Sequence, residues 1–169
     1  HGKARCVARP GSTQEVAEIL KLCAQTNTSV VPQGGNTGLV GGQIPGQGGR
    51  QNEILLSLKR MDRVREVDPA SMTMTVEAGL TLLRVCGLEV VLADGRVLSN
   101  LSKLKKDNTG YDLKHLFMGS EGTLGIITAA VVKLFPRPKV LETAFIGLKS
   151  PHEALALLNL AQSIAGTNV

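Results

Sequence analysis

The chain has 169 residues, of which 43% are hydrophobic and 2% aromatic, with 19 basic and 14 acidic residues and a formal net charge of +5. This length suits one domain core and the beginning of a second. So few aromatic rings leave little for bases to stack on, which argues against a nucleic-acid partner.

No apolar run approaches the roughly 18 residues of a membrane span, and the first residues do not form a signal peptide. We therefore expect no membrane span, and a cytoplasmic protein, or one of the mitochondrial matrix if the source is eukaryotic. The sequence does not indicate an oligomeric state.

The N-terminal part predicts a strand, a helix and a second strand. A short strand is expected at residues 6–8, and Ser12-x-x-Glu15 is a capping box that opens a helix. Residues 30–31 then form a second strand, which completes a compact βαβ-like unit. The apolar face of the helix carries Val16, Ile19, Leu20 and Cys23.

A glycine-rich loop follows directly, and eight of the 19 glycines lie between Gly34 and Gly49. Glycine has no side chain, so the main-chain N–H groups of such a loop are accessible and can converge on the oxygens of a diphosphate. The alternative is a flexible linker, but the apolar pair Leu39-Val40 and the proline at position 32 argue against it. The loop has neither the P-loop lysine nor a G-x-G-x-x-G fingerprint.

The remaining elements are mostly strands. We expect strands at residues 54–58, 64–67, 73–76, 126–135 and 140–148, and a short helix at 112–117. Residues 88–93 and 96–98 predict a hairpin with a two-residue type I′ turn at Asp94-Gly95. Ser150 and Pro151 begin a last helix, and we place a domain boundary near Pro138.

One junction is abnormal. Residues 79–85 begin like an amphipathic helix, yet at Cys86-Gly87 the pattern runs directly into a strand and leaves scarcely one helical turn. We therefore expect a segment to be missing between Val85 and Cys86.

The cysteines and histidines predict no metal site. Neither set has the spacing of a zinc site, and the odd number of cysteines does not suit a disulfide framework. The cysteines are interpreted as small buried residues of a reducing compartment. The residues concerned are Cys6, Cys23 and Cys86, with His1, His115 and His152.

A second glycine cluster precedes the predicted strand at 126–135. The spacing of Gly119, Gly122 and Gly125 indicates a close approach of backbone to a ligand or to the first loop. A tight turn that needs glycine only for its shape is an equal alternative. In the same structural interpretation, Tyr111 would be an anchor, Asp112 would be a helix cap and His115 would be a surface histidine.

Four motifs together resemble one known family. They are P-Q-G-G-N-T-G-L-V-G-G, L-A-D-G-R-V-L, K-D-N-T-G-Y-D-L-K and G-S-E-G-T-L-G-I-I-T. The chain is similar to the FAD-linked oxidase family, with the FAD-binding domain of vanillyl-alcohol oxidase and p-cresol methylhydroxylase. Within it, the likeness is to the D-lactate and D-2-hydroxyglutarate dehydrogenases and the glycolate oxidase flavoprotein subunit.

The resemblance implies an α+β fold: a two-lobed PCMH-type FAD-binding domain at residues 1–138, followed at 139–169 by the incomplete beginning of a substrate (cap) domain. It also implies non-covalent FAD, because Asn36 stands where relatives with covalent flavin have histidine. The implied cofactor-binding residues are Pro32, Gln33, Gly34, Gly35, Asn36, Thr37, Gly38, Leu39, Gly41, Gly42, Glu121, Gly122, Gly125, Ile126 and Ile127.

The family normally has a long flavin-contacting segment at the abnormal junction. Its absence indicates either a natural or engineered deletion or a disordered stretch left out of the sequence, and the second is favoured because losing a cofactor wall should ruin the domain. A real deletion would put FAD binding itself in question.

The implied activity is oxidation of a D-2-hydroxy acid by hydride transfer to flavin, with electrons passed to a separate acceptor. D-2-hydroxyglutarate, D-lactate and glycolate fit equally, as do an electron-transfer flavoprotein, a quinone or a cytochrome as acceptor. The alternatives are an oxygen-reducing oxidase of the same fold and a non-catalytic nucleotide-binding remnant. No catalytic residue and no metal ligand is assigned to this chain.

Overall fold

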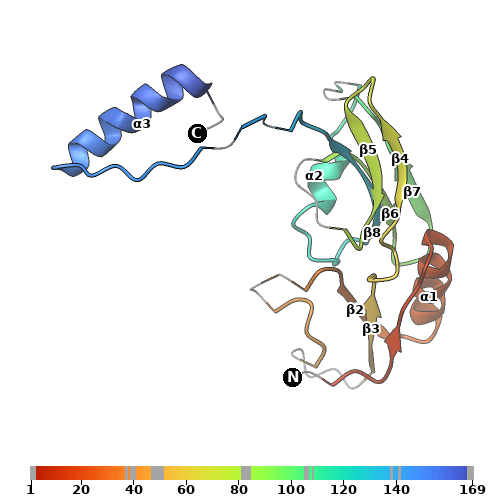
Figure 1. The fold of residues 1–169 in the computed structure, drawn as a ribbon. Coiled ribbons are helices and arrows are strands. Elements are labelled where there is room, and N and C mark those ends of the chain that lie inside the picture. Colours follow the sequence, from red (N-terminus) through yellow and green to blue (C-terminus); the bar gives the residue numbers. More distant parts are fainter. Residues whose placement is uncertain are drawn as a thin grey trace. The chain divides into compact units, whose positions relative to one another are not determined.

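The computed structural model describes residues 3–36, 38, 41–46, 52–80, 85–104, 107, 109–137, 139–140 and 142–166 (Figure 1). The chain divides into two compact units, residues 1–135 and residues 136–169. The first unit contains two sheets, each in its own lobe. We call these the small lobe, residues 3–58, and the large lobe, residues 64–135.

The small lobe is a three-stranded parallel sheet with one long helix. Its elements are β1 (Val7–Ala8), α1 (Thr13–Gln25), β2 (Ser29–Gln33) and β3 (Glu53–Ser57). The sheet order is β1-β3-β2, so β3, the last of these three strands along the chain, lies in the middle. The predicted strand, helix and strand are confirmed. The strand predicted at 54–58 is also present as β3, and it lies between β1 and β2.

Helix α1 begins where the capping box predicts. The Ser12 hydroxyl accepts a hydrogen bond from the Glu15 N–H at 3.2 Å, and the Glu15 carboxylate accepts one from the Gly11 N–H at 2.8 Å. The helix packs against β2 of the small lobe and against β6 of the large lobe. Its buried residues are Val16, Ala17, Leu20 and Cys23.

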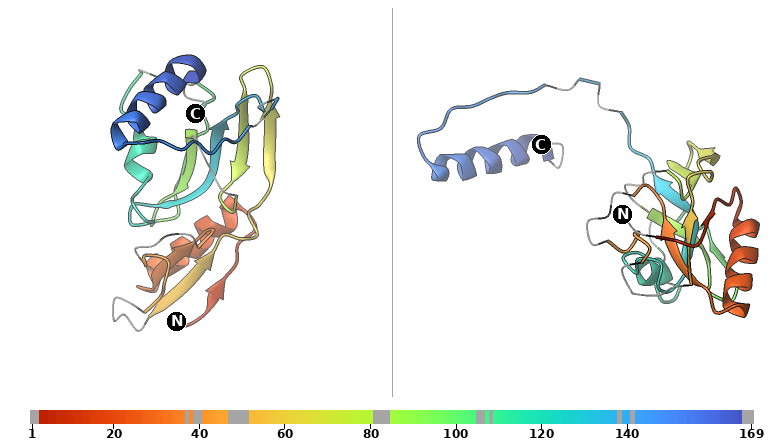
Figure 2. Two further views of the ribbon diagram at one scale, coloured as in Figure 1. Left: turned by 60° about the vertical axis from the view of Figure 1, so that its left-hand side comes forward. Right: turned by 90° about the horizontal axis from the view of Figure 1, so that it is seen from below.

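The large lobe is an antiparallel sheet in the order β4-β5-β8-β6-β7, with a short helix against it (Figures 1 and 2). Strand β8 is central, and six of its eight residues are buried. It ends two residues before the predicted strand does. The elements are β4 (Val64–Asp68), β5 (Thr73–Glu77), β6 (Val85–Val91), β7 (Val97–Asn100), α2 (Leu113–Phe117) and β8 (Ile126–Lys133).

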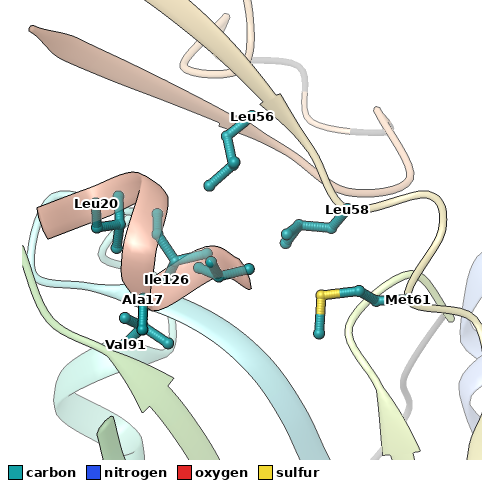
Figure 3. Packing of buried hydrophobic residues seen from close by; sticks show 8 residues of the cluster. Ala17, Leu20, Leu56, Leu58, Met61, Val91 and Ile126 are labelled. Atoms are coloured by element: carbon teal, nitrogen blue, oxygen red, sulfur yellow. The ribbon is translucent and has the colours of Figure 1, made fainter. Parts of the chain in front are cut away.

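One hydrophobic core joins the two lobes (Figure 3). Val16 of α1, Leu56 of β3 and Met61 of the connection between the lobes have no exposed surface. Val91 and Ile126 of the large sheet complete the same cluster. Burial of each such side chain contributes about 1.5 to 3 kcal/mol, so the lobes are held together mainly by apolar packing.

The hairpin between β6 and β7 differs from the prediction. The Leu92 N–H donates to the Arg96 carbonyl, and the Gly95 N–H donates to the Leu92 carbonyl, both at 2.9 Å. Of the turn residues only Gly95 has a positive φ, +84°, whereas a type I′ turn needs two. The type I′ prediction is therefore wrong. The turn has three residues, and the Asp94 carboxylate stabilises it by accepting from the Arg96 N–H at 3.0 Å.

The second unit contains helix α3 (Pro151–Ala165), which Ser150 caps and Pro151 begins, as predicted. The predicted strand at 140–148 is wrong, because residues 142–148 form neither helix nor strand. Its apolar side chains, such as Phe145 and Ile146, are exposed. A strand needs a neighbour to pair with, and in the described part of the chain this segment has none.

Two further findings concern single features. All three cysteines are free. Their interpretation as buried residues is confirmed for Cys23, whereas Cys86 is half-buried, and it is wrong for Cys6, which is exposed. The predicted helix at 79–85 falls mainly on residues 81–84, which lie outside the described residues. Among the described helices, none has both the length and the apolar character needed to cross a membrane.

Candidate functional site

The first glycine motif leaves the small sheet at the end of β2. Gln33 is the last residue of this strand, and its carbonyl accepts a hydrogen bond from the Leu58 N–H at 2.9 Å. The beginning of the loop is therefore fixed to β3. Eight of the predicted site residues lie in the described part of this segment: Pro32, Gln33, Gly34, Gly35, Asn36, Gly38, Gly41 and Gly42. Thr37 and Leu39 lie outside the described residues.

Two residues that the sequence did not single out, Gln43 and Glu53, shape the loop. The Gln43 amide donates to the Gly38 carbonyl at 2.6 Å, and the Gln33 amide donates to the Gln43 carbonyl at 3.3 Å. At the far end the buried Glu53 carboxylate accepts from the Gly46 N–H at 2.6 Å. A glutamate that begins an otherwise apolar strand was the available sign that an anchor of this kind exists.

The second motif is a tight turn between α2 and β8. The Ser120 N–H donates to the Phe117 carbonyl, and the Thr123 N–H donates to the Ser120 carbonyl. Gly119 and Gly122 have positive φ values of +83° and +79°, and Glu121 between them has +53° although it is not glycine. Such a backbone is strained for a residue with a side chain, and strain of this kind is concentrated at functional sites.

The two motifs meet. A Cβ atom on Gly122 would overlap Cγ of Pro32 and lie 3.3 Å from its Cδ, so backbone packs directly on the proline ring. A Cβ atom on Gly42 would lie 2.9 Å from a carboxylate oxygen of Glu121. The prediction that the second glycine cluster approaches a ligand or the first loop is confirmed for the loop.

The other residues of the second motif lie deeper. A Cβ atom on Gly125 would lie 2.7 Å from Cγ1 of Val90, Ile126 belongs to the core that joins the lobes, and Ile127 packs against a second core cluster. The structure therefore brings Glu121 and Gly122 into contact with the glycine loop. Gly125 and Ile127 contact residues of the large lobe, and Ile126 contributes to the core that both lobes share.

A cavity of about 590 Å³ lies beside this contact. Its size is in the range of small-molecule sites. Leu20 and Cys23 of α1 line it. The predicted site residues that line it are Pro32, Gly42, Glu121, Gly122, Gly125 and Ile126. Burial raises the pKa of the Cys23 thiol, which keeps it neutral in this wall.

The charge of the site is unusual for an anion site. Residues 32–46 and 119–127 contain no lysine, arginine or histidine, and Glu121 is their one charged residue. A diphosphate at this place would therefore be bound by main-chain N–H groups rather than by cations. Glycines leave those groups accessible, which is the physical reason for their number here.

Comparisons with known proteins agree with this geometry. Residues 4–85 match the FAD binding domain family. The D-2-hydroxyglutarate dehydrogenase of Danio rerio mitochondria is 38% identical over 211 residues, which cover 98% of this chain and 39% of that protein. The D-2-hydroxyglutarate–pyruvate transhydrogenase of Saccharomyces cerevisiae is 36% identical, over 88% of this chain and 38% of that protein. The chain belongs to the FAD-linked oxidase family.

Solved structures place the fold in the same family. An alkyldihydroxyacetonephosphate synthase superposes with a TM-score of 0.68 at 22% identity, covering 79% of this chain and 32% of that chain. A p-cresol methylhydroxylase gives 0.65 at 22% identity, covering 79% and 36%. The predicted α+β, PCMH-type FAD-binding fold is confirmed, and FAD is the cofactor of this domain.

The chain is shorter than these relatives. It spans about 39% of the Danio rerio protein, and the alignment runs over 211 positions although the chain has 169 residues. The relative therefore contains residues, within the matched span, that have no counterpart here. The family match ends at residue 85, which is the abnormal junction of the sequence.

The residues present fit FAD at the place where the motifs meet. A cavity lies there, glycine backbone lines it, and a Cβ atom on Gly34 would meet nothing closer than the Ala78 carbonyl oxygen at 3.7 Å. The open space over Gly34 leaves its main chain accessible to a ligand. The described loop residues from Pro32 to Gly42, with Glu121, Gly122, Gly125 and Ile126, are the ones that would hold the cofactor.

Proposed function

We propose that this chain is the FAD-holding part of a dehydrogenase that oxidises a D-2-hydroxy acid. The observation that carries the proposal is the similarity to D-2-hydroxyglutarate dehydrogenases over 98% of the chain. The convergence of the two glycine motifs on one cavity supports it, because a dehydrogenase of this kind must hold its cofactor firmly.

When bound, FAD supplies an acceptor for the hydride that leaves the α-carbon of the hydroxy acid. The residues of this chain bind and orient it. Main-chain N–H groups of described loop residues such as Gly34, Gly35 and Gly42 would donate to the diphosphate. Each such bond to a charged group contributes roughly 1.5 to 3 kcal/mol. The contact between Pro32 and Gly122, with the apolar core behind it, would exclude water from one side of the cofactor cavity. The base and the carboxylate-binding groups are proposed to lie outside this chain.

The proposed substrate is D-2-hydroxyglutarate, with D-lactate second, because the names of the relatives include both. Glycolate is the third candidate. We further propose that FAD is bound non-covalently and that electrons pass to a separate acceptor. A eukaryotic form is proposed to work in the mitochondrial matrix, and the word mitochondrial in the names of the relatives supports this.

A second candidate is a remnant that binds a nucleotide without turnover. The observation that favours it is the alignment, in which relatives have residues that this chain lacks. Under this second candidate, a longer form that contains such a segment would bind FAD normally, whereas this chain by itself would bind FAD weakly or not at all.

The experiment compares this chain with a longer form that contains the relatives' additional segment and a complete substrate domain. Both are reconstituted with FAD, and the visible spectrum and FAD fluorescence report binding. Acid precipitation that releases all flavin would support non-covalent attachment. The longer form is then mixed anaerobically with D-2-hydroxyglutarate, D-lactate and glycolate, with L-2-hydroxyglutarate as the control. Loss of flavin absorbance with a D-acid supports the dehydrogenase, and a bound flavin that no acid reduces contradicts it.

A further inference from the structure

Two buried glutamates face each other across the central strand of the large sheet. Glu77 of β5 and Glu89 of β6 are both in register with Ala129 of β8, one on each side. Their exposed fractions are 1% and 9%. Neighbouring strands lie about 4.8 Å apart, so the two Cα atoms are roughly 10 Å apart, within reach of one long cation. Two buried negative charges at this distance need such a cation.

Arg65 of β4 supplies it. Its Nε donates to Glu77 at 3.2 Å and its Nη1 donates to Glu89 at 3.1 Å, so one guanidinium bridges both carboxylates. Arg65 lies at a β-bulge between Val64 and Glu66, and the pairing of β6 with β8 is also irregular just after Glu89. Bulges re-aim side chains, which explains how strands at different positions in the sheet direct these groups to one point.

The same guanidinium reaches the small lobe. Its Nη2 donates to the Thr13 hydroxyl at 2.9 Å, and that hydroxyl donates to Glu89 at 2.6 Å. Arg63 adds a bond from its Nη2 to the Gly11 carbonyl at 3.2 Å. The first turn of α1 is therefore fastened to the large sheet by polar bonds, in addition to the apolar core. We call this set, Thr13, Arg63, Arg65, Glu77 and Glu89, the lobe bridge.

The carboxylates of the lobe bridge are ionised at neutral pH. Burial alone would raise the pKa of Glu77, but hydrogen bonds from Arg63 and Arg65 outweigh it and lower that pKa below its ordinary value. For Glu89 burial is again opposed, here by bonds from Thr13, Thr128 and Arg65, and its pKa is also lowered. The bridge is thus a satisfied set of charges and not a pair of neutral acids.

Helix α1 connects the lobe bridge to the cofactor cavity. Thr13 is its first residue, whereas Leu20 and Cys23 near its other end line the cavity beside the glycine loop. The helix has 13 residues and is about 20 Å long at 1.5 Å per residue, and it acts as one rigid body. Leu20 and Cys23 therefore form one wall of the cavity, and Gly122 of the large lobe forms the other. The distance between the walls therefore depends on how α1 is docked on the large sheet.

We propose that Arg65 is a positioning residue for the cofactor: by bridging Glu77, Glu89 and Thr13 it sets the docking of α1 on the large sheet and thereby the spacing of the two walls of the FAD cavity. Stability alone does not account for the arrangement, because apolar residues of similar volume often replace a buried ion network without loss. The inference rests on the proposed FAD site, to which Arg65 makes no direct contact.

The test uses the longer form, and compares Arg65→Met, Arg65→Lys and Thr13→Val with the matched control Arg96→Met. Arg96 forms an exposed ion pair with Asp94 in the β6–β7 hairpin, so the control removes one cation without touching the bridge. We expect Arg65→Met to weaken FAD binding at least about tenfold, Arg65→Lys less, and Arg96→Met less than twofold. Thr13→Val, which changes no charge, is expected to act in the same direction and covers the case in which Arg65→Met fails to fold.

A second readout does not depend on FAD. Spin labels introduced as noncanonical amino acids at the exposed positions Leu22 of α1 and Val97 of β7 report the distance between the lobes. We expect Arg65→Met and Thr13→Val to shift or broaden this distance in the folded protein, and Arg96→Met to leave it unchanged. An unchanged distance, or unchanged FAD affinity in both bridge variants, overturns the inference. If the unsubstituted protein binds no FAD, the proposed function fails instead, and the distance alone decides the docking role.

Discussion

Replacing Gly122 by alanine tests whether the two glycine motifs must touch. Gly122 has a φ of +79°, which costs an alanine about 1 to 2 kcal/mol. The added methyl would also overlap the ring of Pro32, and overpacking of this kind costs about 1 to 3 kcal/mol. We expect a total loss of about 2 to 5 kcal/mol in the free energy of unfolding, and weaker FAD binding because the proline must move.

Gly119→Ala is the matched control. Gly119 has nearly the same φ, +83°, but nothing lies within 4 Å of the position of its Cβ atom. The control therefore has the backbone strain without the collision, and we expect it to lose only about 1 to 2 kcal/mol. Urea unfolding followed by circular dichroism measures both variants, and FAD fluorescence titration measures affinity. Equal losses in the two variants would refute the importance of the contact between the motifs.

Three other outcomes follow from the described contacts. Gly34→Ala should keep or slightly raise stability, because its Cβ atom would meet nothing closer than 3.7 Å, yet should weaken FAD binding by covering the main chain; unfolding and FAD titrations that change together would contradict this. The lowered pKa values of Glu77 and Glu89 stabilise the fold above the ordinary glutamate pKa, and this contribution should disappear as pH falls through the folded-state values; urea unfolding between pH 7 and pH 3 should show a shallower loss for Glu89→Gln. A hydrogen bond from Lys103 lowers the pKa of Asp68 to about 2, and carboxyl NMR titration should find it returning toward its ordinary value in Lys103→Met.

Local sequence patterns predicted local structure well. The Ser12 and Ser150 caps each involve residues three apart, and both helices begin where the patterns indicate. Strand β8 was recognisable because its residues are apolar on both faces. The hairpin turn was misassigned because Asp-Gly also occurs in three-residue turns, where only the glycine needs a positive φ.

Features that depend on distant partners were beyond the sequence. The strand predicted at 140–148 has the right composition, but composition does not supply a neighbour. Glu77 and Glu89 each lie between two apolar residues, as they would on a solvated face, and Arg65 stands in a polar stretch beside Glu66. Nothing local indicates that the three side chains meet across four strands. The contact between Pro32 and Gly122 was expected only in general terms, because register and lobe docking decide it.

The position of β3 between β1 and β2 has a consequence for how this site can be altered. The glycine loop is the crossover from β2 to the adjacent parallel strand β3, and in its described part, residues 34–36, 38 and 41–46, it has no helix. The pairing of β2 with β3 therefore holds the lobe together at both ends of the crossover. The sequence of the crossover itself is constrained mainly by ligand binding. The segment between β2 and β3 is therefore the place to change the sequence if this domain is to be engineered to bind another dinucleotide, because both sheets can be kept as they are.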